Sequence, residues 1–197
     1  MNAIPLPLTR EESLAFLRQL NHDSSDIPHY LATEAIMRAL AEEWKEDPEY
    51  WGILGLLHDV DWSLTKDNQE EHCIKAEELL ADKGFQKEEI AIIQSHGYGC
   101  DQIPALKDRL RTQRIEFALA SAETITGLIY AYALMRGRRI TDMAPSKLKK
   151  KFKDKSFAAG CNRAIIQEIE KAGMDMDRFF SIAIQAMQSI KESIGLE

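Results

Sequence analysis

An apolar run that ends in an adjacent imidazole and carboxylate constrains this chain more than any other stretch. Residues 51–57 have the sequence WGILGLL, in which apolar side chains surround most of a helix, so the run predicts a helix buried on nearly all sides. His58 and Asp59 follow it directly. A buried carboxylate needs a cation or hydrogen-bond partners, and both side chains are good ligands for a divalent metal. Taken alone, the pair is explained more simply by a core histidine beside an exposed aspartate at the helix end.

The composition is that of an ordinary globular chain. Its 197 residues are 45% hydrophobic and 29% charged, which predicts one domain with a continuous core over residues 1–197. The net charge of −7 argues against a protein that binds nucleic acid by neutralising phosphates. Three cysteines without a CxxC pair do not form a disulfide framework, and residues 1–8 lack the pattern of a signal peptide. We therefore expect a cytoplasmic protein.

One segment has the composition of a membrane span. Residues 117–135 are almost free of charge and have arginines on both sides. Glu123 lies inside the segment, however, with Ser121, Thr124 and Thr126 around it, and a charge near the centre of a bilayer costs about 2.5–3.5 kcal/mol. We interpret the segment as a buried helix of a soluble bundle and expect no membrane association.

Helical periodicity describes the rest of the chain. A capping box at residues 9–12 (TREE) begins a first helix, and no long alternating run of β-branched residues competes with helices elsewhere. The predicted fold is therefore all-α, in one domain without repeats or a linker. Further helices are predicted to begin near Pro28 and Pro48, to include residues 72–80, to end near His96, and to span residues 163–172 and 177–196.

Four of the five histidines lie on or at the end of a predicted helix with apolar neighbours. They are His29, His58, His72 and His96, and Asp59 and Glu123 add two carboxylates. The fifth, His22, lies in a polar loop and is most simply a solvated residue. Helices that pack around one core can bring such side chains together, as bundles do when they build di-metal sites. From the residues alone, a metal site and a set of separate structural histidines explain the pattern about equally well.

The order of these residues resembles that of the HD superfamily of metal-dependent phosphohydrolases, whose all-helical fold is named after its His-Asp pair. The resemblance rests on an ordered set of motifs and covers most of the chain. The motifs are His29, LLHDVDW at residues 56–62, EH at 71–72, SHG at 95–97, TGLI at 126–129 and KSFAAG at 155–160. Together they are similar to a small stand-alone bacterial branch of the superfamily, whose members are known only as predicted hydrolases.

The resemblance implies a set of metal ligands. By position, His29, His58 and Asp59 bind metal, and His58 and Asp59 form the catalytic pair. His72 and His96 match the additional histidines of members that hold two ions, in which case Asp59 bridges them. The implied cofactor is one or two divalent ions of Fe, Mn, Co, Ni, Zn or Mg. The metal-binding core would span about residues 26–136, with C-terminal helices at about 145–196 packed on it.

Glu123 departs from the family pattern. It occupies the place where the superfamily usually has aspartate, and its extra methylene changes the reach of the carboxylate. A site with a single ion, in which His72 and His96 line the pocket, is therefore an alternative to the site with two ions.

The implied activity is hydrolysis of a phosphate ester or anhydride in a small phosphorylated compound, such as a phosphomonoester, a nucleotide or a phosphodiester. Hydroxide generated from water at the metal site would attack the phosphorus. Glu123 motivates a second hypothesis, a catalytically silent module that senses a phosphorylated ligand. A helical structural protein without metal is a third.

Two lysines are candidate contacts for the substrate. Lys75 lies three residues after His72, on the same face of the predicted helix, and Lys66 lies in the loop after the His-Asp pair. Both are more simply solvated lysines. On the same predicted helix, Cys73 should point about 100° away from His72, so Cys73 is not a first-choice ligand.

Overall fold

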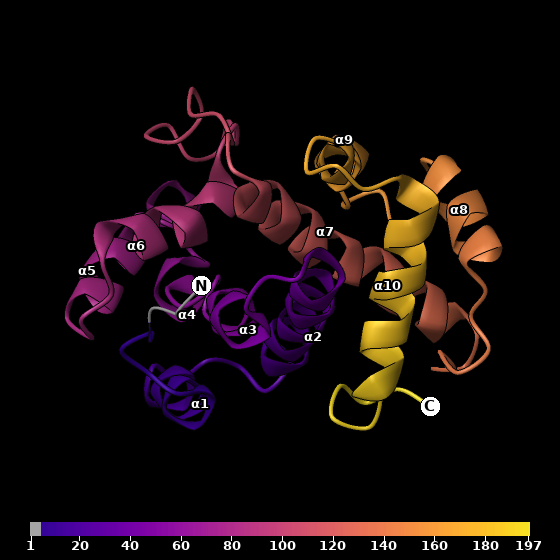
Figure 1. Cartoon of the computed structure of the whole chain (residues 1–197), viewed down its shortest axis with the longest axis horizontal. Helices are drawn as coiled ribbons and strands as arrows, with labels where there is room; N and C mark the ends of the chain where they lie inside the picture. Colours follow the sequence, from indigo (N-terminus) through magenta and orange to yellow (C-terminus); the bar gives the residue numbers. More distant parts are fainter. Residues whose placement is uncertain (1–4) are drawn as a thin grey trace.

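The computed structural model describes residues 5–197, and all regular structure in that range is helical. The fold is therefore all-α, as predicted (Figure 1). The α-helices are α1 (Arg10–Gln19), α2 (Ile27–Trp44), α3 (Pro48–Leu56), α4 (Trp62–Thr65), α5 (Lys75–Ala81), α6 (Lys87–Gln94), α7 (Arg114–Met135), α8 (Pro145–Lys153), α9 (Arg163–Gln167) and α10 (Met176–Ser189). Three short 3₁₀ turns join them, namely η1 (Gln69–Glu71), η2 (Ser95–Gly97) and η3 (Glu168–Glu170).

Helix α7 is the longest element and crosses the middle of the molecule (Figure 1). It packs against α2, α3 and α6 among the N-terminal helices, and against α8, α9 and α10 among the C-terminal ones. Within the described residues it is the one helix long and apolar enough to cross a membrane, yet 56% of its most apolar window is buried inside the molecule. Its apolar composition therefore follows from its place in the core, as predicted for this segment.

Helices α2 and α3 pack closely because two glycines of α3 face α2. A Cβ atom at Gly52 would lie 2.6 Å from the side chain of Arg38, and one at Gly55 would lie 2.9 Å from Cγ of Met37. A larger residue at Gly55 would press on Met37 and on the backbone carbonyl of Thr33, whereas one at Gly52 would displace the side chain of Arg38. The close approach places the turn after α3, with its His-Asp pair, beside the first turn of α2, which carries His29.

Hydrogen bonds confirm the predicted capping box at the start of α1. The backbone N–H of Glu12 donates to the hydroxyl of Thr9 over 3.2 Å, and the backbone N–H of Thr9 donates to the Glu12 carboxylate over 2.8 Å. Each of the two side chains thus accepts a hydrogen bond from a backbone N–H group that has no partner within the helix.

Three predicted helices have ends that differ from the prediction. The helix predicted over residues 163–172 is α-helical only from Arg163 to Gln167 and continues as the 3₁₀ turn η3. The helix predicted from residue 72 begins at Lys75, because Cys73 has a left-handed backbone (φ 65°) that interrupts helical geometry. The last helix ends at Ser189 instead of Leu196. The residues after it turn back, and the backbone N–H of Ile140 donates to the carbonyl of Glu197 over 2.7 Å. The chain end therefore packs beside the loop that follows α7.

Candidate metal centre

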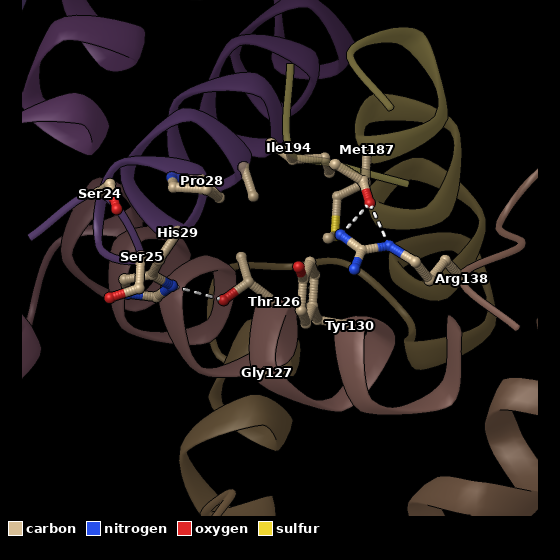
Figure 2. Close-up of a pocket in the computed structure, with 12 residues that line it drawn as sticks. Ser24, Ser25, Pro28, His29, Thr126, Gly127, Tyr130, Arg138, Met187 and Ile194 are labelled. Atoms are coloured by element: carbon tan, nitrogen blue, oxygen red, sulfur yellow. Dashed lines mark hydrogen bonds between the residues drawn. The ribbon is translucent and has the colours of Figure 1, made fainter. Parts of the chain in front are cut away.

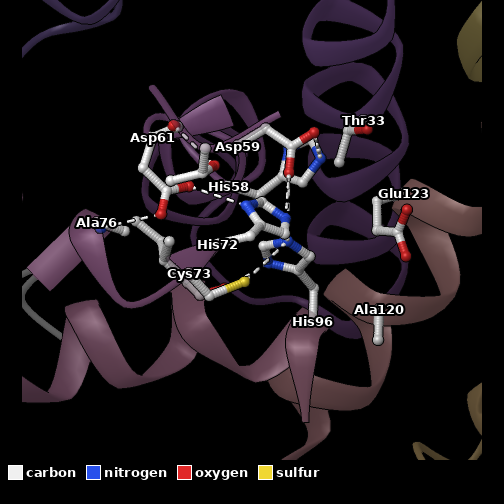
Figure 3. Close-up of polar contacts among 12 residues, drawn as sticks. Thr33, His58, Asp59, Asp61, His72, Cys73, Ala76, His96, Ala120 and Glu123 are labelled. Atoms are coloured by element: carbon white, nitrogen blue, oxygen red, sulfur yellow. Dashed lines mark hydrogen bonds and ion pairs between the residues drawn. The ribbon is translucent and has the colours of Figure 1, made fainter. Parts of the chain in front are cut away.

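Five of the predicted ligands come together from four separate segments. His29 lies in the first turn of α2, His58 and Asp59 lie in the turn between α3 and α4, His72 lies just before α5, and His96 lies in η2. Figure 3 shows the labelled imidazoles grouped beside Asp59, where the first helices of the chain meet α7. The convergence that the motif order implied is thus present in the structure.

The carboxylate of Asp59 lies between two pairs of imidazoles. Its Oδ2 atom is 3.4 Å from Nε2 of His58 and 3.7 Å from Nε2 of His29. Its Oδ1 atom is 3.2 Å from Nε2 of His96 and 3.4 Å from Nε2 of His72. Within the pairs, the two Nε2 atoms are 3.1 Å apart for His29 and His58 and 3.2 Å apart for His72 and His96. One carboxylate therefore separates two donor groups, each with two nitrogens and one oxygen.

Backbone carbonyls fix the orientation of two of these rings. Nδ1 of His58 lies 2.8 Å from the carbonyl oxygen of Gly55, and Nδ1 of His96 lies 2.7 Å from that of Ile93. A carbonyl oxygen only accepts hydrogen bonds, so Nδ1 carries the proton in both rings. The Nε2 atoms of both rings consequently face the carboxylate of Asp59.

Side chains fix the other two rings in the same sense. The carboxylate of Asp61 accepts from Nδ1 of His72 over 3.0 Å and also from the backbone N–H of Ala76 over 3.2 Å. The hydroxyl of Thr126 donates its proton to the carbonyl of Glu123 over 2.6 Å, so its oxygen accepts from Nδ1 of His29 at 2.8 Å. In all four rings Nδ1 is thus held by an acceptor, and all four Nε2 atoms face the same small volume.

This donor set fits a divalent cation. Two unprotonated nitrogens 3.1–3.2 Å apart repel each other unless a proton or a metal ion lies between them. Imidazole nitrogens combined with a carboxylate suit the transition metals from Mn²⁺ to Zn²⁺. His29, His58 and Asp59 would hold one ion, and Asp59, His72 and His96 would hold a second.

Burial and neighbouring charges adjust the protonation of the cluster. Burial and the nearby His58 lower the pKa of His29 to about 4, so this ring is neutral at neutral pH. Burial would raise the pKa of Asp59, but the facing imidazoles of His58 and His96 outweigh it and hold that pKa well below its ordinary value. Burial opposes protonation of His72, yet its hydrogen bond to Asp61 raises the pKa to about 10. A cation that binds His72 must therefore displace a proton.

The three remaining predicted site residues lie outside the cluster. The carboxylate of Glu123 accepts a hydrogen bond from the hydroxyl of Thr124 and is not among the donor groups that lie within 4.8 Å of one another. Lys66 pairs with Asp23 over 2.8 Å, and Lys75 pairs with Glu71 over 2.5 Å, with both lysine side chains largely exposed. Their roles as ligand and as substrate contacts stay predictions.

Sequence reasoning missed the residues that orient the ligands. Asp61 and Thr126 were present in the quoted motifs, but their hydrogen bonds depend on segments that meet only in the fold. His22 was expected to be solvated, which is wrong. It is half-buried, with Nε2 3.1 Å from the carbonyl of Val60 and Nδ1 2.9 Å from the hydroxyl of Tyr30. It therefore ties its loop to the turn that carries the His-Asp pair.

Two cavities adjoin the cluster and share His29. The smaller, about 240 Å³, is bordered by Asp26, Tyr30, Asp59 and Trp62 and opens directly onto the cluster. The larger, about 460 Å³, lies between α2, α7 and the end of the chain. Figure 2 shows His29 and Ser25 at one end of it and Arg138 at the other, with Thr126 and Tyr130 between. Its volume lies in the range of small-molecule sites, roughly 300–1,000 Å³.

The chain is an all-α bundle that gathers imidazoles around one aspartate, an arrangement by which helical proteins can hold metal ions. The family model of the HD domain matches residues 27–121, and this part of the chain belongs to that family. The match contains all four clustered histidines and Asp59, and it ends just before Glu123. Comparison with curated proteins and with solved structures gave no match. HD domains form a family of metal-dependent phosphohydrolases, so the family and the donor groups agree. The narrower bacterial branch stays a prediction.

Proposed function

We propose that this protein is a metal-dependent phosphohydrolase that acts on a small phosphorylated compound in the cytoplasm. One observation carries the proposal, namely that the two oxygens of Asp59 face two separate pairs of imidazole nitrogens at 3.2–3.7 Å. A carboxylate in that place can bridge two cations. The net charge of −7 supports a small-molecule substrate over nucleic acid.

The residues of the chain have distinct parts in this proposal. His29 and His58 hold one side of the site, His72 and His96 hold the other, and Asp59 sets the spacing between them. When bound, divalent cations supply Lewis acidity that lowers the pKa of water and offsets the charge that builds on phosphoryl oxygens. The buried walls around His58 and His96 exclude bulk water, which strengthens these interactions.

The larger cavity supports a place for the organic part of the substrate. With the phosphoryl group at the cluster, the attached group would extend past His29 along α7. The walls there are mostly apolar, with Met187 and Ile194 on the side of the C-terminal segment. At the far end, the guanidinium of Arg138 donates to the carbonyl of Gly195 over 2.8 and 2.6 Å. Its other N–H groups are available to a polar or anionic substituent.

Activity screens on metal-loaded variants test the proposal. The chelated protein is reloaded with Mn²⁺, Fe²⁺, Co²⁺ or Mg²⁺ in turn and assayed on phosphomonoesters, nucleotides and phosphodiesters. We expect His58→Ala and Asp59→Ala to abolish both metal content and hydrolysis while the far-ultraviolet circular dichroism spectrum is kept. Asp142→Ala, which removes an exposed carboxylate far along the chain, should leave both unchanged. Full hydrolysis by Asp59→Ala would contradict the proposal.

A silent sensor of phosphorylated ligands is a second candidate, and Glu123 favours it. The carboxylate at this position is bonded to Thr124 and lies outside the two donor groups. The same screen separates the two candidates. If no metal and substrate combination gives hydrolysis but a phosphorylated compound raises the melting temperature, the sensor is favoured.

A further inference from the structure

Cys73 lies against the second donor group, where the sequence alone did not place it. It is fully buried, and its Sγ atom lies 3.4 Å from Nε2 of His96. The prediction that it would point away from His72 assumed a helix, but His72 has an extended backbone and Cys73 a left-handed one. The resulting turn places both side chains on the side of η2. Figure 3 shows the sulfur beside the imidazole of His96.

The distances match the edges of a four-coordinate shell. With metal–nitrogen distances of about 2.0–2.1 Å and a metal–sulfur distance of about 2.3 Å, neighbouring donors in a tetrahedron lie about 3.3–3.6 Å apart. Around His96 the corresponding distances are 3.2 Å to Nε2 of His72, 3.2 Å to Oδ1 of Asp59 and 3.4 Å to Sγ of Cys73. His72, Cys73 and His96 also form one of the two donor groups whose atoms all lie within 4.8 Å of one another.

Gly97 keeps the space for this sulfur. A Cβ atom at Gly97 would lie 2.7 Å from Sγ of Cys73, a distance that would force the sulfur to move. Gly97 has no left-handed backbone that would require glycine for another reason. The absence of a side chain at Gly97 thus leaves space for the thiol of Cys73.

We infer that Cys73 is the fourth ligand of the second cation, beside Asp59, His72 and His96. The inference rests on the proposed metal-dependent function. It makes the two positions unequal, because the second is closed by four protein donors while the first has three and faces the cavities that His29 borders. Closed shells are typical of structural sites and open ones of catalytic sites. A thiolate also favours Zn²⁺, Co²⁺ or Fe²⁺ over Mg²⁺ and Mn²⁺ at the second position.

Spectroscopy of the cobalt-loaded full chain tests this ligand without an activity assay. We expect a thiolate-to-cobalt charge-transfer band in the near ultraviolet at full loading. Cys73→Ser should lose the band and bind the second ion at least about tenfold more weakly, whereas Cys100→Ser should keep it. X-ray absorption of the zinc-loaded protein should show one sulfur at about 2.3 Å.

A second variant avoids any folding defect at position 73. The double variant Cys100→Ser with Cys161→Ser leaves Cys73 as the one remaining cysteine and should keep both the band and the sulfur distance. A fully loaded wild-type protein without either signal, or a band that survives Cys73→Ser, would overturn the inference. Either result would contradict the role of Cys73 and leave the proposed hydrolysis to its own assay. A protein that shows the band but no hydrolysis would contradict the proposed hydrolysis and not the role of Cys73.

Discussion

The chemistry of the cluster depends on hydrogen bonds behind the ligands as much as on the ligands themselves. Each clustered imidazole has its Nδ1 atom bonded to an acceptor, and each acceptor belongs to a different residue. Partners of this kind choose the tautomer and orient the ring before a cation binds. Removal of one such partner typically lowers metal affinity about 10- to 100-fold. The positioning residues are therefore part of the site.

Glu123 predicts a pH-dependent change in stability. Burial raises the pKa of its carboxyl above the ordinary value of 4.5. Above the raised pKa, the folded chain carries the cost of ionising a partly buried carboxyl; below 4.5, the carboxyl is protonated in both states and that cost is gone. Glu123→Gln should therefore raise the melting temperature of the chelated protein by a few degrees at neutral pH, since about 1 kcal/mol corresponds to roughly 2–4 °C in a chain of this size. The difference should vanish in acid.

A matched variant shows whether burial causes the effect. Glu77→Gln removes an exposed carboxylate on α5 and should change the melting temperature little at either pH. Equal melting temperatures for the wild-type protein and Glu123→Gln at neutral pH would show that the ionised carboxylate is well solvated in the folded chain.

Apart from His29 in α2, the candidate ligands lie in short turns that are held in place by hydrogen bonds to residues far away in the sequence. Arg111 gives an example, since its buried guanidinium donates to the carbonyl oxygens of His96 and Tyr98 over 2.8 and 3.0 Å. It also donates to the carboxylate of Glu168 in η3 over 2.9 Å. One side chain thus connects η2, which carries His96, to the C-terminal helices.

Arg111→Met should loosen that connection. It leaves two carbonyls without this donor and leaves Glu168 with only its exposed partner Lys171, and breaking a buried pair costs about 3 kcal/mol or more. We expect urea unfolding at a correspondingly lower midpoint, together with weaker metal binding. Lys171→Ala removes a second, exposed partner of Glu168 and should cost less than about 1 kcal/mol. Similar losses in the two variants would contradict the role given to Arg111.

One large hydrophobic cluster holds most of the molecule together, and the candidate metal centre joins four segments of the chain. Buried side chains from α1 to Leu196 belong to this cluster. A ligand that binds only the folded chain at 100 times its dissociation constant stabilises it by about 2.7 kcal/mol. Added Co²⁺ or Zn²⁺ at that excess should therefore raise the melting temperature by roughly 5–11 °C in a single transition.

Calorimetry with and without a chelator measures this shift. Asp59→Ala should show a much smaller shift, because both positions lose their shared carboxylate. A shift of the same size in that variant would mean that the cations stabilise the chain elsewhere. Two transitions, of which only one responds to metal, would mean that the core does not unfold as one unit.

Local patterns along the chain were enough to predict the fold class and the capping box at Thr9, because helical periodicity is a property of neighbouring residues. The candidate ligands came from the resemblance to the HD superfamily, since the residues alone left the metal site undecided. The turn at Cys73 and the early end of α10 were missed, since a left-handed backbone and a returning chain end depend on contacts with distant segments. Only the folded chain could place the hydroxyl of Thr126 against His29, 97 residues away, or direct four Nε2 atoms towards Asp59. Those distances arise from the packing of helices, which no short stretch of sequence encodes.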